Sequence, residues 1–279
     1  MTAKIIEREE IKLSSSQAAM IKSGWGEAVL NDTVVERITY LSDGLKVQGY
    51  IAYPKKHSHK LPCIMWNRGG FGDKGAIDRF NAKGIYGRIA SWGYVVFASQ
   101  YRGNAGGEGK EQMGGDDVND ILNLMDIAAE LPFADESNWG MEGWSRGGMM
   151  TFLALRKTQK VRCAVLSGAI SNLKQIADDN PGMKEKYKSL IESKNPEEGL
   201  LKRSAVYFAD ELPRIPYLIF HGGRDDTVSP LQSIKLAEKF HTLGMDYRLV
   251  IFEGGDHYLK SFRKETERLR KEWFEKYLK

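Results

Sequence analysis

Short apolar runs alternate with helix-length segments through most of this chain, and the alternation restricts its fold more than any other feature. Because a strand, a helix and a second strand connect through a right-handed crossover, the alternation predicts a mostly parallel central sheet with helices on both faces. The apolar runs lie at residues 62–67, 94–99, 138–142, 162–167, 216–221 and 247–252. The helix-length segments lie at residues 77–92, 116–131, 147–158, 230–243 and 259–278.

A different pattern precedes this region. Apolar and polar residues alternate at 34–41 and 46–53 around the turn sequence Ser-Asp-Gly at 42–44. This pattern predicts an antiparallel hairpin at the N-terminal side of the sheet. Residues 1–33 lack a strand pattern and are expected to form an N-terminal arm or helix. Residues 34–279 are expected to form one domain, because a chain of 279 residues suits one large α/β domain.

One connection in this domain is much longer than the others. Roughly fifty residues separate the run ending at Gly168 from the next apolar run, and structureless connections of that length are uncommon in compact domains. The prolines at 181, 196 and 213 interrupt this segment. It is either an inserted helical cap or a mobile loop, and we expect a helical cap at about residues 171–212.

The charge balance and the hydropathy pattern argue against several function classes. The net charge is +4, but the 41 basic and 37 acidic residues are interspersed, unlike those of a nucleic-acid-binding surface. No run approaches the roughly 18–20 apolar residues of a membrane span, and residues 1–16 lack a secretory signal. We therefore expect a cytoplasmic protein without nucleic-acid or membrane partners. Cys63 and Cys163 are expected to be buried free thiols, and no metal or other cofactor is implied.

The sequence Gly-Trp-Ser-Arg-Gly at 143–147 fits the pattern GxSxG and lies between a strand-like run and a helix-like segment. A serine attacks a carbonyl only when its hydroxyl is exposed beside a base, and a tight strand-to-helix turn provides that exposure. The flanking glycines tolerate the backbone angles of such a turn and leave space that side chains would fill. Ser145 is therefore the candidate nucleophile.

A carboxylate pair and an imidazole follow the last two apolar runs. Asp225 and Asp226 come after the first of these runs, and His257 comes after the second. Reactive groups of open α/β sheets gather at the carboxyl ends of strands, and the order serine, aspartate, histidine is that of the α/β-hydrolase fold. His257 is the candidate base and an aspartate its orienting group, although spacing alone does not separate Asp225 from Asp226. His221, which precedes a double glycine, is interpreted as structural.

Acyl transfer also requires N–H donors for the developing oxyanion, each typically worth about 3–4 kcal/mol. The backbone N–H of Arg146, at the start of a predicted helix, is one candidate. Gly70 is the second, because its glycine-rich loop follows a predicted strand and permits close approach to a substrate. Arg68 and Trp144 are candidate substrate-binding residues, although arginines at such positions are more often ion-pair partners.

Several longer sequences resemble the catalytic domain of the prolyl oligopeptidase and acylaminoacyl peptidase family of serine hydrolases. They are RGGF at 68–71, YRGN at 101–104, GGDDV at 114–118, GWSRGG at 143–148, HGGRDDTV at 221–228 and GDH at 255–257. The resemblance extends from about Val47 to the C-terminus. It implies an α/β-hydrolase fold, and it implies that the orienting acid is Asp225, the first aspartate of the pair.

The resemblance also implies a function: cleavage of an ester or peptide bond through an acyl-enzyme, with a small ester or a short peptide as substrate. Family peptidases usually carry an N-terminal β-propeller, whereas only residues 1–33 precede the predicted hairpin here. A small-molecule carboxylesterase is therefore an alternative. In several family members a tyrosine or a histidine stands where this chain has Arg68. Further alternatives are an inactive hydrolase-fold binding protein and an acyltransferase, and the sequence leaves the oligomeric state open.

Overall fold

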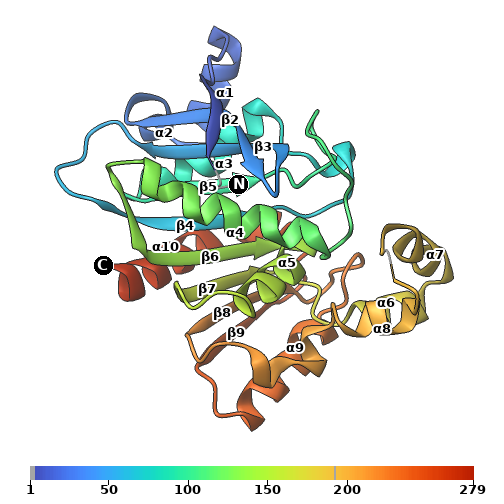
Figure 1. The fold of residues 1–279 in the computed structure, drawn as a ribbon. Coiled ribbons are helices and arrows are strands. Elements are labelled where there is room, and N and C mark those ends of the chain that lie inside the picture. Colours follow the sequence, from blue (N-terminus) through green and yellow to red (C-terminus); the bar gives the residue numbers. More distant parts are fainter. Residues whose placement is uncertain (1–3, 192) are drawn as a thin grey trace. The chain divides into compact units, whose positions relative to one another are not determined.

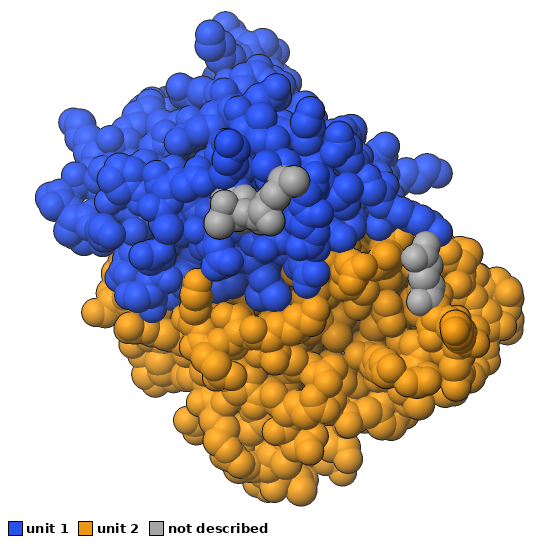
Figure 2. Space-filling model, in the orientation of Figure 1, with its two compact units in different colours: residues 1–110, 119–139 blue, residues 111–118, 140–279 orange. Residues whose placement is uncertain are grey.

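The computed structural model describes residues 4–191 and 193–279, which group into two compact units. Unit 1 contains the chain up to Lys110 together with Asn119–Trp139 (blue in Figure 2). Unit 2 contains Glu111–Val118 together with Gly140–Lys279 (orange in Figure 2). Both units combine strands with helices, as the α/β class requires.

Unit 1 is built on strands in the order β1-β2-β3-β5-β4. β2 and β3 form an antiparallel hairpin in which Ser42 lies opposite Leu45, which confirms the predicted hairpin. β4 and β5 are parallel and are buried along their whole length, as their continuous apolar sequences predict. The bounds are β1 (Ile5–Glu10), β2 (Thr33–Ser42), β3 (Leu45–Pro54), β4 (Leu61–Asn67) and β5 (Val95–Ser99).

The strand β1 is not predicted by the sequence pattern, because its sequence, IIEREE, is mostly charged. It pairs antiparallel with β2, and five of its six residues are exposed. Two ion pairs connect it to the rest of unit 1, Arg8 with Glu36 and Glu9 with Arg79. Because an exposed edge strand buries neither face fully, it lacks the apolar period by which strands are recognised.

The helices of unit 1 lie on both sides of its strands. α3 packs against β2, β3 and β5 on one face, and α4 packs on the other face (Figure 1). Gly84 of α3 permits close contact with α1, because a Cβ at this position would overlap the indole of Trp25. The bounds are α1 (Ser15–Trp25), α2 (Glu27–Asn31), α3 (Arg79–Ala90) and α4 (Asn119–Asp126).

The helix-length segment at residues 116–131 is helical, but it is not one continuous α-helix. The segment consists of the 3-10 turn η2 (Asp116–Val118), then α4, then the 3-10 turn η3 (Ile127–Glu130). The carboxylate of Asp117 accepts the backbone N–H of Gly114 at 2.9 Å, and a side chain that bonds nearby backbone in this way competes with regular helix formation. The α-helix therefore begins only at Asn119.

Unit 2 contains the second part of the predicted parallel sheet, with strands in the order β6-β7-β8-β9. β7 pairs parallel with β8, and β8 pairs parallel with β9. β6 begins in unit 1 and ends in unit 2, and it is longer than the apolar run at 138–142. The bounds are β6 (Ala134–Trp144), β7 (Val161–Ser167), β8 (Tyr217–Gly222) and β9 (Tyr247–Phe252).

Helices also cover the strands of unit 2 on both faces. α5 (Arg146–Leu155) and α9 (Leu231–Thr242) pack on one face, and α10 (Arg263–Leu278) packs on the other (Figure 1). Every residue of α5 is buried, which explains why this helix is apolar on all sides. None of the helices in residues 4–191 and 193–279 is both long and apolar enough to cross a membrane.

The long connection of unit 2 is helical. Asn172, Asn180 and Asn195 each accept a backbone N–H of the helix that follows them. Pro181 and Pro196 occupy first-turn positions, where the missing N–H has no intrahelical acceptor to lose. Figure 1 shows the three helices grouped at one end of unit 2. The elements are α6 (Leu173–Asp179), α7 (Pro181–Leu190), α8 (Pro196–Leu201), η4 (Ala205–Tyr207) and η5 (Ala209–Glu211).

Candidate active site

Ser145 occupies a strained turn between β6 and α5. Its backbone has φ 57° and ψ −124°, a conformation that residues with a side chain rarely adopt. The Ser145 N–H donates to the carbonyl of Ser167 at 2.9 Å, and the Ser145 carbonyl accepts the N–H groups of Gly148 and Ile170. These bonds hold the turn in unit 2, at the end of β6 where a nucleophile elbow presents its serine.

Two glycines leave the space that this turn requires. A Cβ on Gly143 would lie 2.5 Å from the carbonyl carbon of Gly147 on the other side of the turn. A Cβ on Gly148 would overlap the side chain of Ala169 and lie 2.9 Å from its Cα. Neither neighbour is the flexible end of a side chain, so a larger residue would displace backbone. These contacts support the steric interpretation of the first glycine of GxSxG, and they extend it to Gly148, which follows the motif.

The structure brings Ser145, His257 and Asp225 together in unit 2. Nε2 of His257 lies 3.0 Å from Oγ of Ser145, and Nδ1 of His257 lies 2.7 Å from Oδ2 of Asp225. Asp225 follows β8 and His257 follows β9, so both side chains come from loops at the carboxyl ends of parallel strands. All three residues are buried, with exposed fractions of 9% for Ser145, 5% for His257 and 7% for Asp225.

The carboxylate of Asp225 is surrounded by donors. Its Oδ1 accepts the N–H groups of Thr227 and Val228 at 2.9 and 2.8 Å, and its Oδ2 faces the imidazoles of His257 and His221. Burial by itself raises the pKa of this carboxyl group. The hydrogen bonds from both imidazoles and from a backbone N–H outweigh the burial and hold the pKa well below its ordinary value. Asp225 is therefore ionised at neutral pH.

Two aromatic side chains hold the loop that carries His257. Nε1 of Trp144 donates to the His257 carbonyl at 3.2 Å, and the two rings lie 5.2 Å apart between centroids. The ring of Tyr258, which is 61% exposed, lies 5.3 Å from that of Trp144. Gly168 has φ 52°, and a Cβ there would lie 3.2 Å from the His257 ring. The imidazole is thus confined between an indole and a glycine backbone.

The Arg146 side chain forms ion pairs beneath the turn. Its guanidinium contacts the carboxylates of Glu111 and Asp117, and all three side chains are buried. Nε of Arg203 donates to the Met113 carbonyl at 2.6 Å in the same segment. The Arg146 side chain is thus an ion-pair partner of two carboxylates. Its backbone N–H lies at the first position of α5.

Arg68 and Gly70 belong to unit 1, in the loop after β4. The buried guanidinium of Arg68 donates to the carbonyl of Gln100 through Nε and Nη2, at 3.1 and 2.7 Å, and to its neighbour's carbonyl through Nη1. It also lies over the ring of Tyr101, 5.0 Å from the centroid. Gly70 has φ 69°, and a Cβ there would lie 2.7 Å from the Cα of Gly75, so this position requires glycine.

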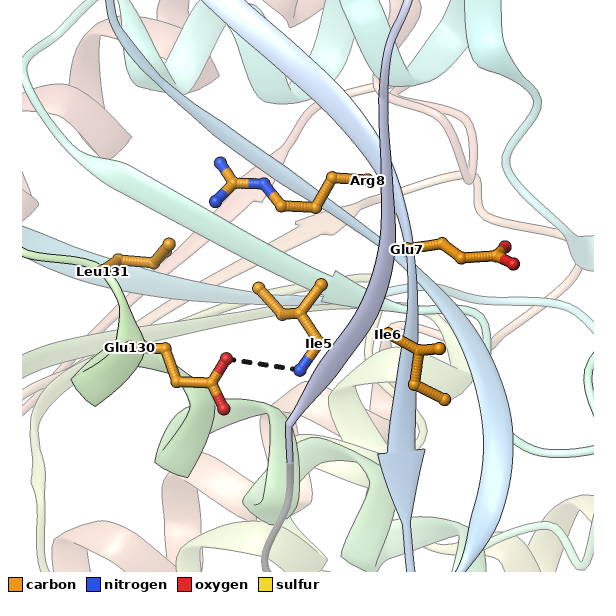
Figure 3. Close-up of a pocket in the computed structure, with 6 residues that line it drawn as sticks. All are labelled: Ile5, Ile6, Glu7, Arg8, Glu130 and Leu131. Carbon is orange, nitrogen blue, oxygen red and sulfur yellow. Dashed lines mark hydrogen bonds between the residues drawn. The ribbon is translucent and has the colours of Figure 1, made fainter.

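A surface hollow in unit 1 contains none of the residues expected to carry chemistry. It has a volume of about 320 Å³ and lies beside β1, where Glu130 accepts the backbone N–H of Ile5 at 3.4 Å (Figure 3). Its lining combines carboxylates, one guanidinium and aliphatic side chains, without a nucleophile or an imidazole. The lining residues are Ile5, Ile6, Glu7, Arg8, Glu130 and Leu131.

The cysteines and the acidic residues offer no obvious metal site. Within residues 4–191 and 193–279, no group of three or more His, Cys, Asp and Glu side chains has an arrangement that could hold a metal ion. Cys63 and Cys163 are buried free thiols, as expected, and burial raises the pKa of both.

Comparison with known proteins shows which family the chain belongs to. The sequence profile described as the prolyl oligopeptidase family matches residues 85–279. The chain belongs to the prolyl oligopeptidase family. A relative in this family is YtmA of Bacillus subtilis, described as an uncharacterized peptidase, which is 30% identical over 238 residues covering 83% of this chain and 88% of YtmA. The family resemblance of the sequence motifs is therefore confirmed.

Larger family members match over part of their length. Dipeptidyl peptidase 8 of Mus musculus is 28% identical over 222 residues, which cover 71% of this chain and 24% of that protein. The solved structure of Pyrococcus horikoshii acylaminoacyl peptidase has a TM-score of 0.76 at 23% identity, covering 97% of this chain and 45% of that chain. This likeness confirms the α/β-hydrolase fold. The chain thus spans most of YtmA and less than half of the two larger proteins.

Two features of the site are absent from the sequence predictions. Tyr258 lies against Trp144 and His257, and its only sequence signal is its position directly after His257. His221, near the end of β8, contacts Asp225 in the loop that follows, and its signal is a separation of four residues. Neither signal predicts a contact by itself, because the contacts depend on how the loops after β8 and β9 fold.

Proposed function

We propose that this protein is a serine peptidase that cleaves short peptides or acylated amino-acid amides through an acyl-enzyme on Ser145. The observation that carries the proposal is the continuous series of hydrogen bonds from Ser145 through His257 to Asp225. Membership of the prolyl oligopeptidase family, and the description of its relative YtmA as a peptidase, favour an amide substrate over a simple ester.

Each step of the proposed mechanism uses one of these hydrogen bonds. Nε2 of His257 takes the hydroxyl proton as Oγ of Ser145 forms its bond to the substrate carbonyl carbon. Ionised Asp225 stabilises the imidazolium that results. The imidazolium then donates its proton to the leaving amine as the amide bond breaks. Water repeats the sequence on the acyl-enzyme, which releases the acid and restores the Ser145 hydroxyl.

Two backbone N–H groups are proposed to bind the oxyanion. The N–H of Arg146 belongs to the first turn of α5, where a helix offers N–H groups without intrahelical acceptors and a positive dipole end. The buried ion pairs of the Arg146 side chain support this role, because they fix the residue that carries the donor. Gly70, in the loop after β4 of unit 1, stays the second donor that the sequence predicts, and its positive φ indicates a specialised loop conformation.

Trp144 and Tyr258 are proposed to contact the apolar part of a substrate. Both rings lie beside His257, and the large exposed fraction of Tyr258 supports contact with a ligand. A substrate-binding role is less well supported for Arg68. Its guanidinium is buried and donates to backbone carbonyls, which favours a role in holding its own loop.

A paired assay tests the proposed reaction. Hydrolysis of an acylaminoacyl p-nitroanilide and of p-nitrophenyl butyrate is measured with the wild type, Ser145→Ala and the control Ser137→Ala, which changes an exposed serine. We expect the wild type and Ser137→Ala to hydrolyse the anilide and Ser145→Ala to lose this activity. Hydrolysis of the ester alone would favour the carboxylesterase alternative. Full activity of Ser145→Ala would contradict the mechanism.

A further inference from the structure

A second buried imidazole, that of His221, lies beside the carboxylate of Asp225. His221 is the fifth residue of β8 and is fully buried. Its Nδ1 lies 2.6 Å from Oγ of Ser233 on α9. Its Nε2 lies 2.8 Å from the carbonyl oxygen of Val228 and 3.2 Å from Oδ2 of Asp225. Both ring nitrogens therefore have partners within hydrogen-bonding distance.

These partners determine the position of the ring proton. A carbonyl oxygen and a carboxylate oxygen can only accept, so Nε2 of His221 must carry a hydrogen. In the neutral ring Nδ1 then accepts, and the hydroxyl of Ser233 is the donor that it meets. The Nε2–H faces the Val228 carbonyl and the Asp225 carboxylate together. The Val228 carbonyl and the Asp225 carboxylate thus select the tautomer that presents a proton to Asp225, and the Ser233 hydroxyl is compatible with it as the donor to Nδ1.

Asp225 consequently lies between two imidazoles. The titratable groups facing its carboxylate are His221, from the end of β8, and His257, from the loop after β9. Both ring nitrogens approach the same oxygen, Oδ2, at 3.2 and 2.7 Å. A continuous series of five side chains results, and it runs from Ser233 through His221, Asp225 and His257 to Ser145.

We propose that His221, anchored through its other ring nitrogen by Ser233, is a positioning residue that orients Asp225 and limits the negative charge that its carboxylate presents to His257. This inference rests on the proposed function of Ser145. The charge of Oδ2 is shared between two donors, so each donor weakens the bond that the carboxylate forms with the other. A purely structural role, in which His221 only anchors the Val228 loop, predicts no change in the titration behaviour of the site.

The two roles are separated by the pH dependence of Ser145 reactivity. The readout is the second-order rate constant for labelling by a fluorophosphonate probe between pH 5 and 9. The variants are His221→Leu, which removes the donor, His221→Gln, whose amide keeps a donor, and Ser233→Ala. The matched control is Ser42→Ala. It also removes a buried hydroxyl, but one that is hydrogen-bonded to Asp120 in unit 1. Ser145→Ala is labelled in parallel.

We expect His221→Leu to lower the labelling rate about 10- to 100-fold, the effect of losing one hydrogen bond to a charged group. The acid limb of its pH–rate profile should move to higher pH, because the Asp225 carboxylate then stabilises the His257 imidazolium more strongly. His221→Gln should recover most of the rate. Ser233→Ala should lower the rate roughly two- to tenfold, as for a neutral hydrogen bond. Ser42→Ala should change the rate less than twofold.

Several results would overturn the inference. The inference is wrong if His221→Leu is labelled at the wild-type rate and its pH–rate profile has an unshifted acid limb, while the wild type is labelled and Ser145→Ala is not. Labelling of Ser145→Ala would instead reject the proposed function. If His221→Leu does not fold, nitrogen-15 NMR of the wild type at pH 7 decides. A neutral His221 ring protonated at Nε2 supports the inference, and a ring protonated at Nδ1 alone contradicts it.

Discussion

The imidazole of His257 lies 2.7 Å from the carboxylate of Asp225. The next residue, Asp226, is exposed, and its carboxylate accepts a hydrogen bond of 3.3 Å from the hydroxyl of its neighbour Thr227. Two consecutive carboxylates therefore have opposite environments, one buried among four donors and one in water. The loop after β8 turns the first of these two side chains toward His257.

The aspartate pair supplies a matched test of the orienting role. Asp225→Asn should lower kcat about 10³- to 10⁴-fold, because an amide cannot hold His257 in the required tautomer or stabilise its charged form. Asp226→Asn should keep kcat within about twofold, as expected for an exposed substitution. Steady-state kinetics on one substrate, with circular dichroism to check folding, measure both. Equal losses in the two variants would contradict the assignment of Asp225.

The lowered pKa of Asp225 predicts an effect on stability at acid pH. A carboxyl group with a lower pKa in the folded state binds fewer protons when folded, so it stabilises the fold above its unfolded pKa of about 3.9. This contribution is lost as the pH falls through that value toward the folded pKa. We therefore expect the wild type to lose its stability advantage over Asp225→Asn between about pH 5 and pH 2. Urea unfolding at several pH values measures the difference, and a constant gap would contradict the prediction.

Much of the sheet could be predicted because several of its strands are buried on both faces. β4 and β5 are buried along their whole length and appear in the sequence as continuous apolar runs. β1 carries charged, exposed side chains and gives no such signal. The first residues of the helices are harder to predict, because single residues determine where each helix begins. Asp78 caps α3 by accepting the N–H of Asn81. Leu259 has left-handed backbone angles, and α10 begins only at Arg263.

In the site, too, some features have a sequence signal and others depend on how the loops fold. Ser145, Asp225 and His257 occupy motifs at the ends of strands, where their order along the chain already indicates a common location. The contact between His221 and Ser233 had no comparable signal. It depends on how the loop after β8 returns the first turn of α9 to the end of that strand.

The glycines of the elbow provide a test of its packing. Gly148→Ala should destabilise the protein by about 1–3 kcal/mol, because the added methyl group would overlap Ala169 and force the backbone to move. It should also reduce activity, since α5 carries the neighbouring Arg146 N–H. Gly24→Ala is the matched control, because this exposed site of α1 has nothing within 4 Å of a new Cβ. That variant should gain about 0.5–1 kcal/mol. Equal unfolding midpoints in denaturant for the two variants would contradict the packing account.

The ion pairs of Arg146 provide a test of the segment that supports the elbow. Asp117→Asn leaves the buried guanidinium with one carboxylate partner and should cost about 3 kcal/mol of unfolding free energy. Glu272→Gln removes the partner of Arg268 in an exposed pair on α10 and should cost less than about 0.5 kcal/mol. Chemical denaturation measures both costs. A loss in Asp117→Asn as small as that in Glu272→Gln would show that the buried pair contributes little.

The central claim is that Ser145 is the nucleophile, and covalent labelling tests it most directly. Wild-type protein is treated with a fluorophosphonate, and intact mass spectrometry followed by peptide mapping locates the adduct. We predict one adduct per chain on Ser145, its loss in Ser145→Ala and a reduced rate of formation in Asp225→Asn. Folded wild-type protein that forms no adduct, or that forms it on a residue other than Ser145, would contradict the account.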